Sequence, residues 1–227
     1  MISRSRPLLL GSASPRRSAL LASLGLPFAV LPADIAEDVE PGELPHAYLE
    51  RIAGAKLGAV QARLEREGHP AGAAQGIAAI LVADTTVVID DSVVGKPADV
   101  AEAVVTLNRL VGRTHTVLTR YAIAAGSLGA GPVAHREPLR ARTVQSQVKL
   151  RAATDQEVLG YAASREGLDK AGAYAAQGLG AFLVESVSGS YTNVVGLPVC
   201  EVVSDLQALG LLEGFPAGFF PEQGARF

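Results

Sequence analysis

The stretch IAAILVADTTVVID, residues 77–90, is strongly β-prone because it is mostly apolar and rich in valine, isoleucine and threonine. One acid in the middle of it, Asp84, interrupts the apolar pattern. An ionised carboxylate inside such a strand costs free energy unless a metal, a cation or a catalytic role compensates for its burial. The stretch therefore predicts a strand whose end opens on a cleft and carries a functional acid into it.

Strand-like and helical segments alternate on both sides of this stretch, which favours a mixed α/β architecture. DDSVVGKP, directly after it, predicts a turn and a short return strand. Further strands are expected at 8–10, 28–31, 114–125 and 144–150, and helices at 15–24, 45–67, 100–111, from 155 after a Thr154–Glu157 capping box, and at 199–212. We expect one domain over residues 7–213, followed by a mobile tail at 214–227.

Composition narrows the class of protein. The apolar content of 48% and the charged content of 19% are typical of a soluble globular domain. A net charge of −3 gives no general attraction for nucleic acid, and the absence of tryptophan limits base stacking. Cys200 is the only cysteine, so an internal disulfide is excluded, and we expect it to be a small buried residue. No apolar run is long enough for a signal peptide or a membrane span, which predicts a cytoplasmic protein.

The stretch LLLGSASPRR, residues 8–17, predicts a strand, a turn and a helix that starts with Ser14 as N-cap and Pro15 in its first turn. Arg16 and Arg17 then lie where the helix already carries partial positive charge, which is mildly unfavourable. An anion bound at the helix N-terminus would reward both guanidinium groups, and Gly11 would let it approach the backbone. The alternative is that the arginines are solvated or paired with surface acids.

The other charged residues each allow a functional and a structural interpretation. Lys56 falls on the apolar face of its helix, so it either extends along the surface or reaches a buried anion. Lys96, in GKP, either returns to the site of Asp84 or lies on the surface. The acidic loop 34–43 is either solvated or supplies one or two oxygen ligands to Mg²⁺. His115 has no partner in a catalytic spacing, which favours a structural role over acid–base chemistry. Neither a P-loop nor a dinucleotide-binding fingerprint is present.

Six segments taken together resemble the Maf family of nucleoside triphosphate pyrophosphatases. They are GSASPRRSALLASLG, AGAK, VADTTVVIDDSVVGKP, GRTHTV, LDKAGAYAAQG and GSYTNVVGLP, and they follow the family's order from about residue 8 to residue 212. The resemblance implies hydrolysis of a nucleoside triphosphate to the monophosphate and pyrophosphate, assisted by Mg²⁺ or Mn²⁺. It also implies an extended mixed sheet with flanking helices, and two lobes around a nucleotide-binding cleft.

The family's functional residues carry over to matching positions. Asp84 matches the proton acceptor that activates water, and Asp84 and Glu37 match the metal-binding acids. The residues implied to bind substrate are Ser12, Arg16, Arg17, Lys56, Thr85, Lys96 and Gln177. Among these, Arg16, Thr85 and Gln177 match positions associated with substrate choice. The forms DKAGAY..QG and GSYxNVVGLP look like those of the subfamily that acts on dTTP and UTP, which extends the expectation to modified pyrimidine nucleotides.

The chain departs from the family pattern in four places. It lacks the tryptophan that many members carry just before Asp169, and it has Arg120 where glycine is usual, at an expected surface position. The loops at 69–76 and 126–136 are longer than typical, and the first could alter contacts with the base.

Two other functions compete with the enzyme. One is a non-catalytic nucleotide-binding regulator of septum formation, and the other is a nucleic-acid-binding protein that uses the arginine pair. As partners we expect a nucleoside triphosphate, no nucleic acid and no membrane, and the resemblance leaves a homodimer open.

Overall fold

The computed structural model describes residues 1–70, 73–126 and 139–216. Most of the expected loop at 126–136 and of the expected tail at 214–227 therefore lies outside the described residues. The strands form one seven-stranded mixed sheet in the order β2-β1-β3-β5-β6-β7, with β4 paired to β3. Their bounds are β1 Leu8–Leu10, β2 Phe28–Val30, β3 Ala79–Ile89, β4 Ser92–Val94, β5 Thr114–Ala125, β6 Arg140–Leu150 and β7 Val184–Ser188.

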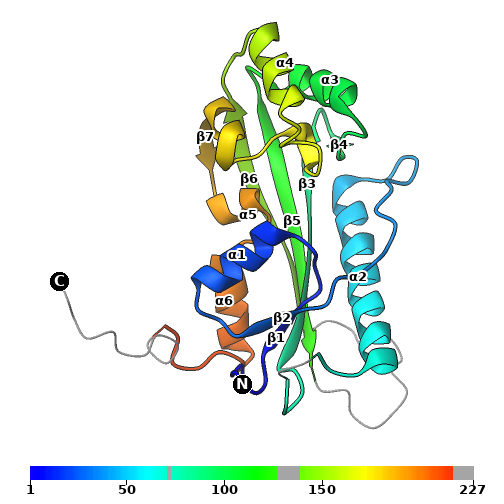
Figure 1. Cartoon of the computed structure of the whole chain (residues 1–227), viewed down its shortest axis with the longest axis vertical. Coiled ribbons are helices and arrows are strands. Elements are labelled where there is room, and N and C mark those ends of the chain that lie inside the picture. Colours follow the sequence, from blue (N-terminus) through cyan, green and yellow to red (C-terminus); the bar gives the residue numbers. More distant parts are fainter. Residues whose placement is uncertain (71–72, 127–138, 217–227) are drawn as a thin grey trace, which may run out of the picture.

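The first strand pairs in parallel with both of its neighbours, and the remaining pairs are antiparallel. The long strands β3, β5 and β6 run through the middle of the sheet (Figure 1). Asp90 and Asp91 join β3 to β4 with positive φ angles, which suit the twist of a two-residue hairpin. The predicted strand around Asp84 and its short return strand are thus confirmed, but Asp84 lies in the middle of β3 and not at its end.

Helices cover both faces of the sheet (Figure 1). Their bounds are α1 Pro15–Ser23, α2 Pro45–Glu67, α3 Val100–Leu110, α4 Asp155–Ala163, α5 Tyr191–Val195 and α6 Val199–Ala208, with two short 3₁₀ helices, η1 Ala171–Ala173 and η2 Gly178–Leu183. Successive side chains of a strand point to opposite faces of the sheet. In β1, Leu8 and Leu10 therefore pack in the apolar cluster of α1 and α6, whereas Leu9 packs in the apolar cluster of α2. A further cluster, under α3 and α4, fills the other end of the sheet.

Four expectations need adjustment. β6 begins at Arg140 rather than at residue 144, and α6 ends at Ala208 rather than at residue 212. Strand β7 was not expected from the sequence. Cys200 is exposed, because α6 buries the side that carries Val202 and Leu206 and Cys200 lies on the opposite side. The capping box of Thr154 and Glu157 is confirmed at the start of α4.

None of the helices in the described part of the chain is long and apolar enough to cross a membrane.

Candidate functional site

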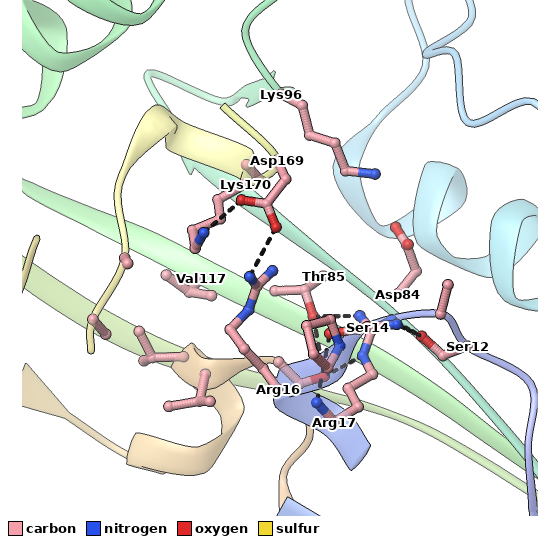
Figure 2. Close-up of a pocket in the computed structure, with 18 of the residues that line it drawn as sticks. Ser12, Ser14, Arg16, Arg17, Asp84, Thr85, Lys96, Val117, Asp169 and Lys170 are labelled. Carbon is pink, nitrogen blue, oxygen red and sulfur yellow. Dashed lines mark hydrogen bonds and ion pairs between the residues drawn. The ribbon is translucent and has the colours of Figure 1, made fainter. Parts of the chain in front are cut away.

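A cavity of about 320 Å³ opens where the start of α1, the middle of β3, the loop before η2 and the end of α5 meet. Figure 2 shows residues of this cavity. Every site residue expected from the sequence lines it: Ser12, Arg16, Arg17, Glu37, Lys56, Asp84, Thr85, Lys96 and Gln177. Since these residues come from segments up to 165 positions apart, the fold itself brings them together.

A chain of ion pairs crosses the cavity. Lys56 Nζ lies 2.5 Å from Asp84 Oδ1 and 2.6 Å from Glu37 Oε1, and Lys96 Nζ lies 2.7 Å from Glu37 Oε2. Lys56 and Asp84 are buried, being 6% and 5% exposed. Lys56 therefore reaches a buried anion rather than extending along the surface, and Lys96 returns to the site. Each buried charge is compensated by its neighbour, as burial requires.

The acidic loop divides its carboxylates between two tasks. Glu37 enters the cavity, whereas Glu43 binds Arg51 of α2 at 2.6 Å and does not line the cavity. Burial by itself would raise the pKa of Glu37, but the ammonium groups of Lys56 and Lys96 outweigh it and lower this pKa to about 2. Glu37 is thus a carboxylate at neutral pH.

The two arginines at the start of α1 have different surroundings. Arg17 is buried, and it donates from Nε to Gly196 O at 2.7 Å, from Nη1 to Ser12 Oγ at 3.0 Å and from Nη2 to Thr85 Oγ1 at 3.0 Å. Arg16 is partly exposed and pairs with Asp169 Oδ2 at 3.1 Å, as Figure 2 shows. Three of the five N–H donors of Arg17 are therefore used inside the protein, and Arg16 is the more accessible group.

Burial lowers the pKa of Arg17 from its usual range, and the carboxylates of Asp84 and Glu37 oppose that effect. Gly11 lines the cavity, and it also has a packing role. A Cβ at this position would lie 2.7 Å from Val60 Cγ2 and from Val82 Cγ1, so glycine lets the end of β1 pack between α2 and β3.

A polar network fixes the far wall of the cavity. Thr85 Oγ1 lies 2.9 Å from Thr119 Oγ1, and Thr119 donates to Asn193 O at 3.0 Å. Asn193 is buried in α5 and donates from Nδ2 to Val117 O and to Ser146 Oγ. The GSYTNVVG segment, one of the six that carry the resemblance, thus holds α5 against β5 and β6.

Gln177 is exposed on the loop that precedes η2. Three residues of the same segment, Asp169, Lys170 and Tyr174, also line the cavity and were missed as site residues, although LDKAGAYAAQG had marked the segment. Behind Tyr174 lies His115, with Nε2 at 2.8 Å from the Tyr174 hydroxyl. Burial lowers the pKa of His115 to about 4, so the ring is neutral at pH 7, which fits the structural role.

Arg120 is partly exposed, as expected for a surface position, and it also has a structural role. It lies directly opposite Asp84 in the pairing of β3 with β5, and it bonds Glu50 of α2 at 2.7 Å. Arg120 also donates to Thr143 of β6 at 3.1 Å. This departure from the family pattern therefore ties the helix that carries Lys56 to the sheet.

The profile of a family described as Maf-like protein matches residues 7–209. The chain belongs to the Maf family. The matched residues run from just before β1 to the end of α6, so they include every element that lines the cavity.

Similar Maf proteins include dTTP/UTP pyrophosphatases of three bacteria. The Geobacter metallireducens protein is 43% identical over 205 residues, which span 90% of this chain and 97% of the relative. The Myxococcus xanthus protein is 46% identical over 204 residues, 90% of this chain and 93% of the relative. The Syntrophotalea carbinolica protein is 40% identical over 208 residues, 92% of this chain and 87% of the relative.

Proposed function

We propose that this Maf protein hydrolyses dTTP and UTP, and modified pyrimidine nucleoside triphosphates, to the monophosphate and pyrophosphate. The names of its relatives supply the substrates. The observation that carries the proposal is a buried acid, Asp84, held by Lys56 inside a cavity that also contains the N-terminal turn of α1. A carboxylate beside a bound triphosphate would repel it unless a metal ion or a catalytic role compensates, which supports a catalytic site.

We propose further that the cavity is a cleft between two lobes. One lobe would contain α1, α2 and α6 with their apolar clusters, and the other would contain α3, α4 and the loop before η2. The lining supports this arrangement, because Ser12 and Lys56 come from the first group of elements, whereas Lys170 and Gln177 come from the second.

Phosphate binding follows from the charges of the lining. Five basic side chains, Arg16, Arg17, Lys56, Lys96 and Lys170, face three acidic ones, Glu37, Asp84 and Asp169. This surplus of positive charge favours a triphosphate, and preorganised cations stabilise the additional charge that develops on the leaving pyrophosphate. In this proposal Arg16 and Lys96, which are the more exposed groups, contact the phosphates directly.

Asp84 would act on the water that attacks the α-phosphorus. Lys56 engages Oδ1 of Asp84 and so restrains the carboxylate, and Oδ2 would orient the water and accept its proton. In this arrangement Lys56 is a positioning residue as well as a cation beside the phosphates.

The donor set at this place fits a magnesium or manganese ion. Glu37 and Asp84 both contact the ammonium group of Lys56, so the two carboxylates lie close together at the cavity wall. Mg²⁺ is commonly held by one or two carboxylates together with substrate phosphates and water. No cluster of three metal-binding side chains occurs within the described ranges, which agrees with such a shared site. When bound, the ion neutralises phosphate charge and makes the phosphorus more electrophilic.

Substrate choice would rest on Gln177, Thr85 and Arg16. The amide of Gln177 both donates and accepts hydrogen bonds, so in a fixed orientation it can pair with the N3–H and the O4 of uracil or thymine. Cytosine presents the opposite pattern at these two atoms. The longer loop at 69–76 does not contribute described residues to the cavity lining.

The decisive experiment replaces the carboxylate of Asp84. Asp84→Asn should lower kcat for pyrophosphate release from dTTP by about 10²- to 10⁴-fold, the contribution of a general base. Nucleotide binding should persist, because Glu37 still pairs with Lys56. The measurement is pyrophosphate release with Mg²⁺ and with Mn²⁺, together with calorimetric titration of dTTP.

Asp90→Asn is the matched control, because Asp90 is an exposed acid in the β3–β4 turn and asparagine tolerates its positive φ. It should keep wild-type turnover. Wild-type kcat in Asp84→Asn would contradict the mechanism. A wild-type chain that binds dTTP without releasing pyrophosphate would instead favour the non-catalytic regulator of septum formation. Cytoplasmic location and a homodimer remain predictions of the sequence.

A further inference from the structure

The 167–180 loop carries Asp169, Lys170 and Gln177. The carboxylate of Glu166, which does not line the cavity, binds the end of this loop to its start. Glu166 accepts hydrogen bonds from Leu179 N at 2.9 Å and from Gly180 N at 2.8 Å. It also accepts one from the Tyr161 hydroxyl at 3.0 Å. The same hydroxyl accepts a bond from Ala175 N at 3.0 Å. Glu166 and Tyr161 thus hold backbone amides on both sides of Gln177.

The loop backbone is shaped around this carboxylate. Gly178 follows Gln177 with a φ of +69°, and a Cβ there would lie 2.3 Å from Glu166 Oε1. A Cβ at Gly180 would lie 2.5 Å from the Tyr161 hydroxyl. Both positions therefore exclude a side chain, and the hydrogen bonds to Glu166 require this close approach.

The charge state of Glu166 suits its role as an acceptor. Burial by itself raises the pKa of this carboxyl, but the amides of Gly180 and Leu179, the Tyr161 hydroxyl and the charge of Lys170 lower it overall. An ionised carboxylate offers acceptors on both oxygens, and hydrogen bonds to a charged acceptor are stronger than those to a neutral one.

Gln177 itself has no comparable support. Within the described ranges its side chain makes no hydrogen bond, and it is exposed at the cavity wall. The position of the Gln177 side chain therefore depends on the backbone of the loop. Glu166 and Tyr161 hold this backbone through amide groups on either side of Gln177. A shift of the loop would move the amide of Gln177 without moving Asp84 or Lys56, which lie on β3 and α2.

We propose that Glu166 is a specificity-positioning residue, which fixes the 167–180 loop so that Gln177 discriminates between pyrimidine bases. The proposal rests on the proposed function, because it assumes that Gln177 reads the base of a nucleoside triphosphate. Glu166 should affect the choice between bases more than the hydrolytic step, which depends on Asp84.

The test compares Glu166→Gln with the wild-type chain. Glutamine replaces one acceptor oxygen with an NH₂ group, which cannot accept from Leu179 or Gly180 and instead opposes their N–H donors. The ratio of kcat/KM for dTTP to kcat/KM for dCTP should fall by about tenfold, the factor expected from the loss of a hydrogen bond to a charged acceptor. Hydrolysis of dCTP should persist. Glu185→Gln, an exposed acid paired with Lys149, is the matched control and should keep the wild-type ratio.

A double-mutant cycle separates positioning from a general loss of structure. If Glu166 acts through Gln177, the ratio in Glu166→Gln/Gln177→Ala should equal the ratio in Gln177→Ala alone. Independent, additive losses in the double variant would overturn the proposal. Tyr161→Phe removes the bridging hydroxyl without introducing a polar group, so it serves if Glu166→Gln fails to fold, and it should lower the ratio as well.

The two proposals can fail separately. An active wild-type chain that prefers dTTP, together with an unchanged ratio in Glu166→Gln and Tyr161→Phe, overturns only the role of Glu166. A wild-type chain that releases no pyrophosphate, or treats dTTP and dCTP alike, overturns the proposed function and the inference that rests on it.

Discussion

At the scale of single residues, the pair Arg16–Arg17 shows how neighbours in sequence acquire different roles. Both lie in the first turn of α1, where a cation is unfavourable unless an anion or hydrogen-bond acceptors stabilise it. Arg17 points inward and joins α1 to β3 and to the end of α5 through three hydrogen bonds. Arg16 points to the cavity and meets Asp169. Hydrogen bonds inside the protein therefore stabilise the charge of Arg17. The charge of Arg16 is stabilised by Asp169 and, in our proposal, by a substrate phosphate.

Methionine substitutions should separate these roles. Arg17→Met should lower the free energy of unfolding by about 2–4 kcal/mol, because it leaves buried acceptors without their charged donor. Arg16→Met should change it by less than about 1 kcal/mol, since the ion pair is partly exposed, but should raise KM for dTTP. Urea unfolding and steady-state kinetics measure the two effects. Equal losses of stability in both variants would contradict this division.

At the scale of elements, local patterns predicted most of the strands and helices. The β-branched stretch around Asp84 became β3, and the Ser14 and Thr154 caps both start helices. The prediction failed where local sequence is a weak signal. Strand β7 is short and half-exposed, and its formation depends on pairing with β6. The apolar residues after Ala208 had extended the predicted α6, but the helix ends there.

Two glycines on neighbouring elements should respond to alanine in opposite directions. Gly11→Ala inserts a Cβ between the fully buried Val60 and Val82, so it should cost about 1–3 kcal/mol and move α2, with Lys56, away from β3. Gly54 lies in α2 with open space around its Cβ position, so Gly54→Ala should stabilise by about 0.5–1 kcal/mol. Thermal unfolding and dTTP hydrolysis measure both. A neutral Gly11→Ala would instead favour the expectation that Gly11 serves ligand approach.

At the scale of the whole molecule, burial couples folding to pH. His115 has a folded-state pKa of about 4 and a usual value of 6.5, because burial disfavours the charged ring. Between these values the unfolded chain binds more protons than the folded one, so stability falls as pH drops from 6.5 to 4. Glu37, with its pKa lowered to about 2, adds a loss of stability only below its usual value of 4.5.

His115→Gln should therefore flatten the dependence of stability on pH between 6.5 and 4.5. Glutamine keeps a hydrogen-bonding group near the Tyr174 hydroxyl but does not titrate. Urea unfolding of both chains at half-unit intervals of pH measures the two slopes. If the variant keeps the wild-type slope, the buried neutral histidine is not the source of the dependence.

The mixed α/β class, the main elements and the segments that contribute to the site could be predicted from the sequence, because these depend on local periodicity, capping and matching motifs. Tertiary structure decided which partners the charged groups have. Helical periodicity placed Lys56 on a buried face, but only the packing of α2 on β3 put its ammonium group between Asp84 and Glu37. In the same way, no local pattern indicated that Glu166 would hold the loop of Gln177. A sequence pattern identifies which face of an element is buried, whereas the element that covers this face follows from the global packing.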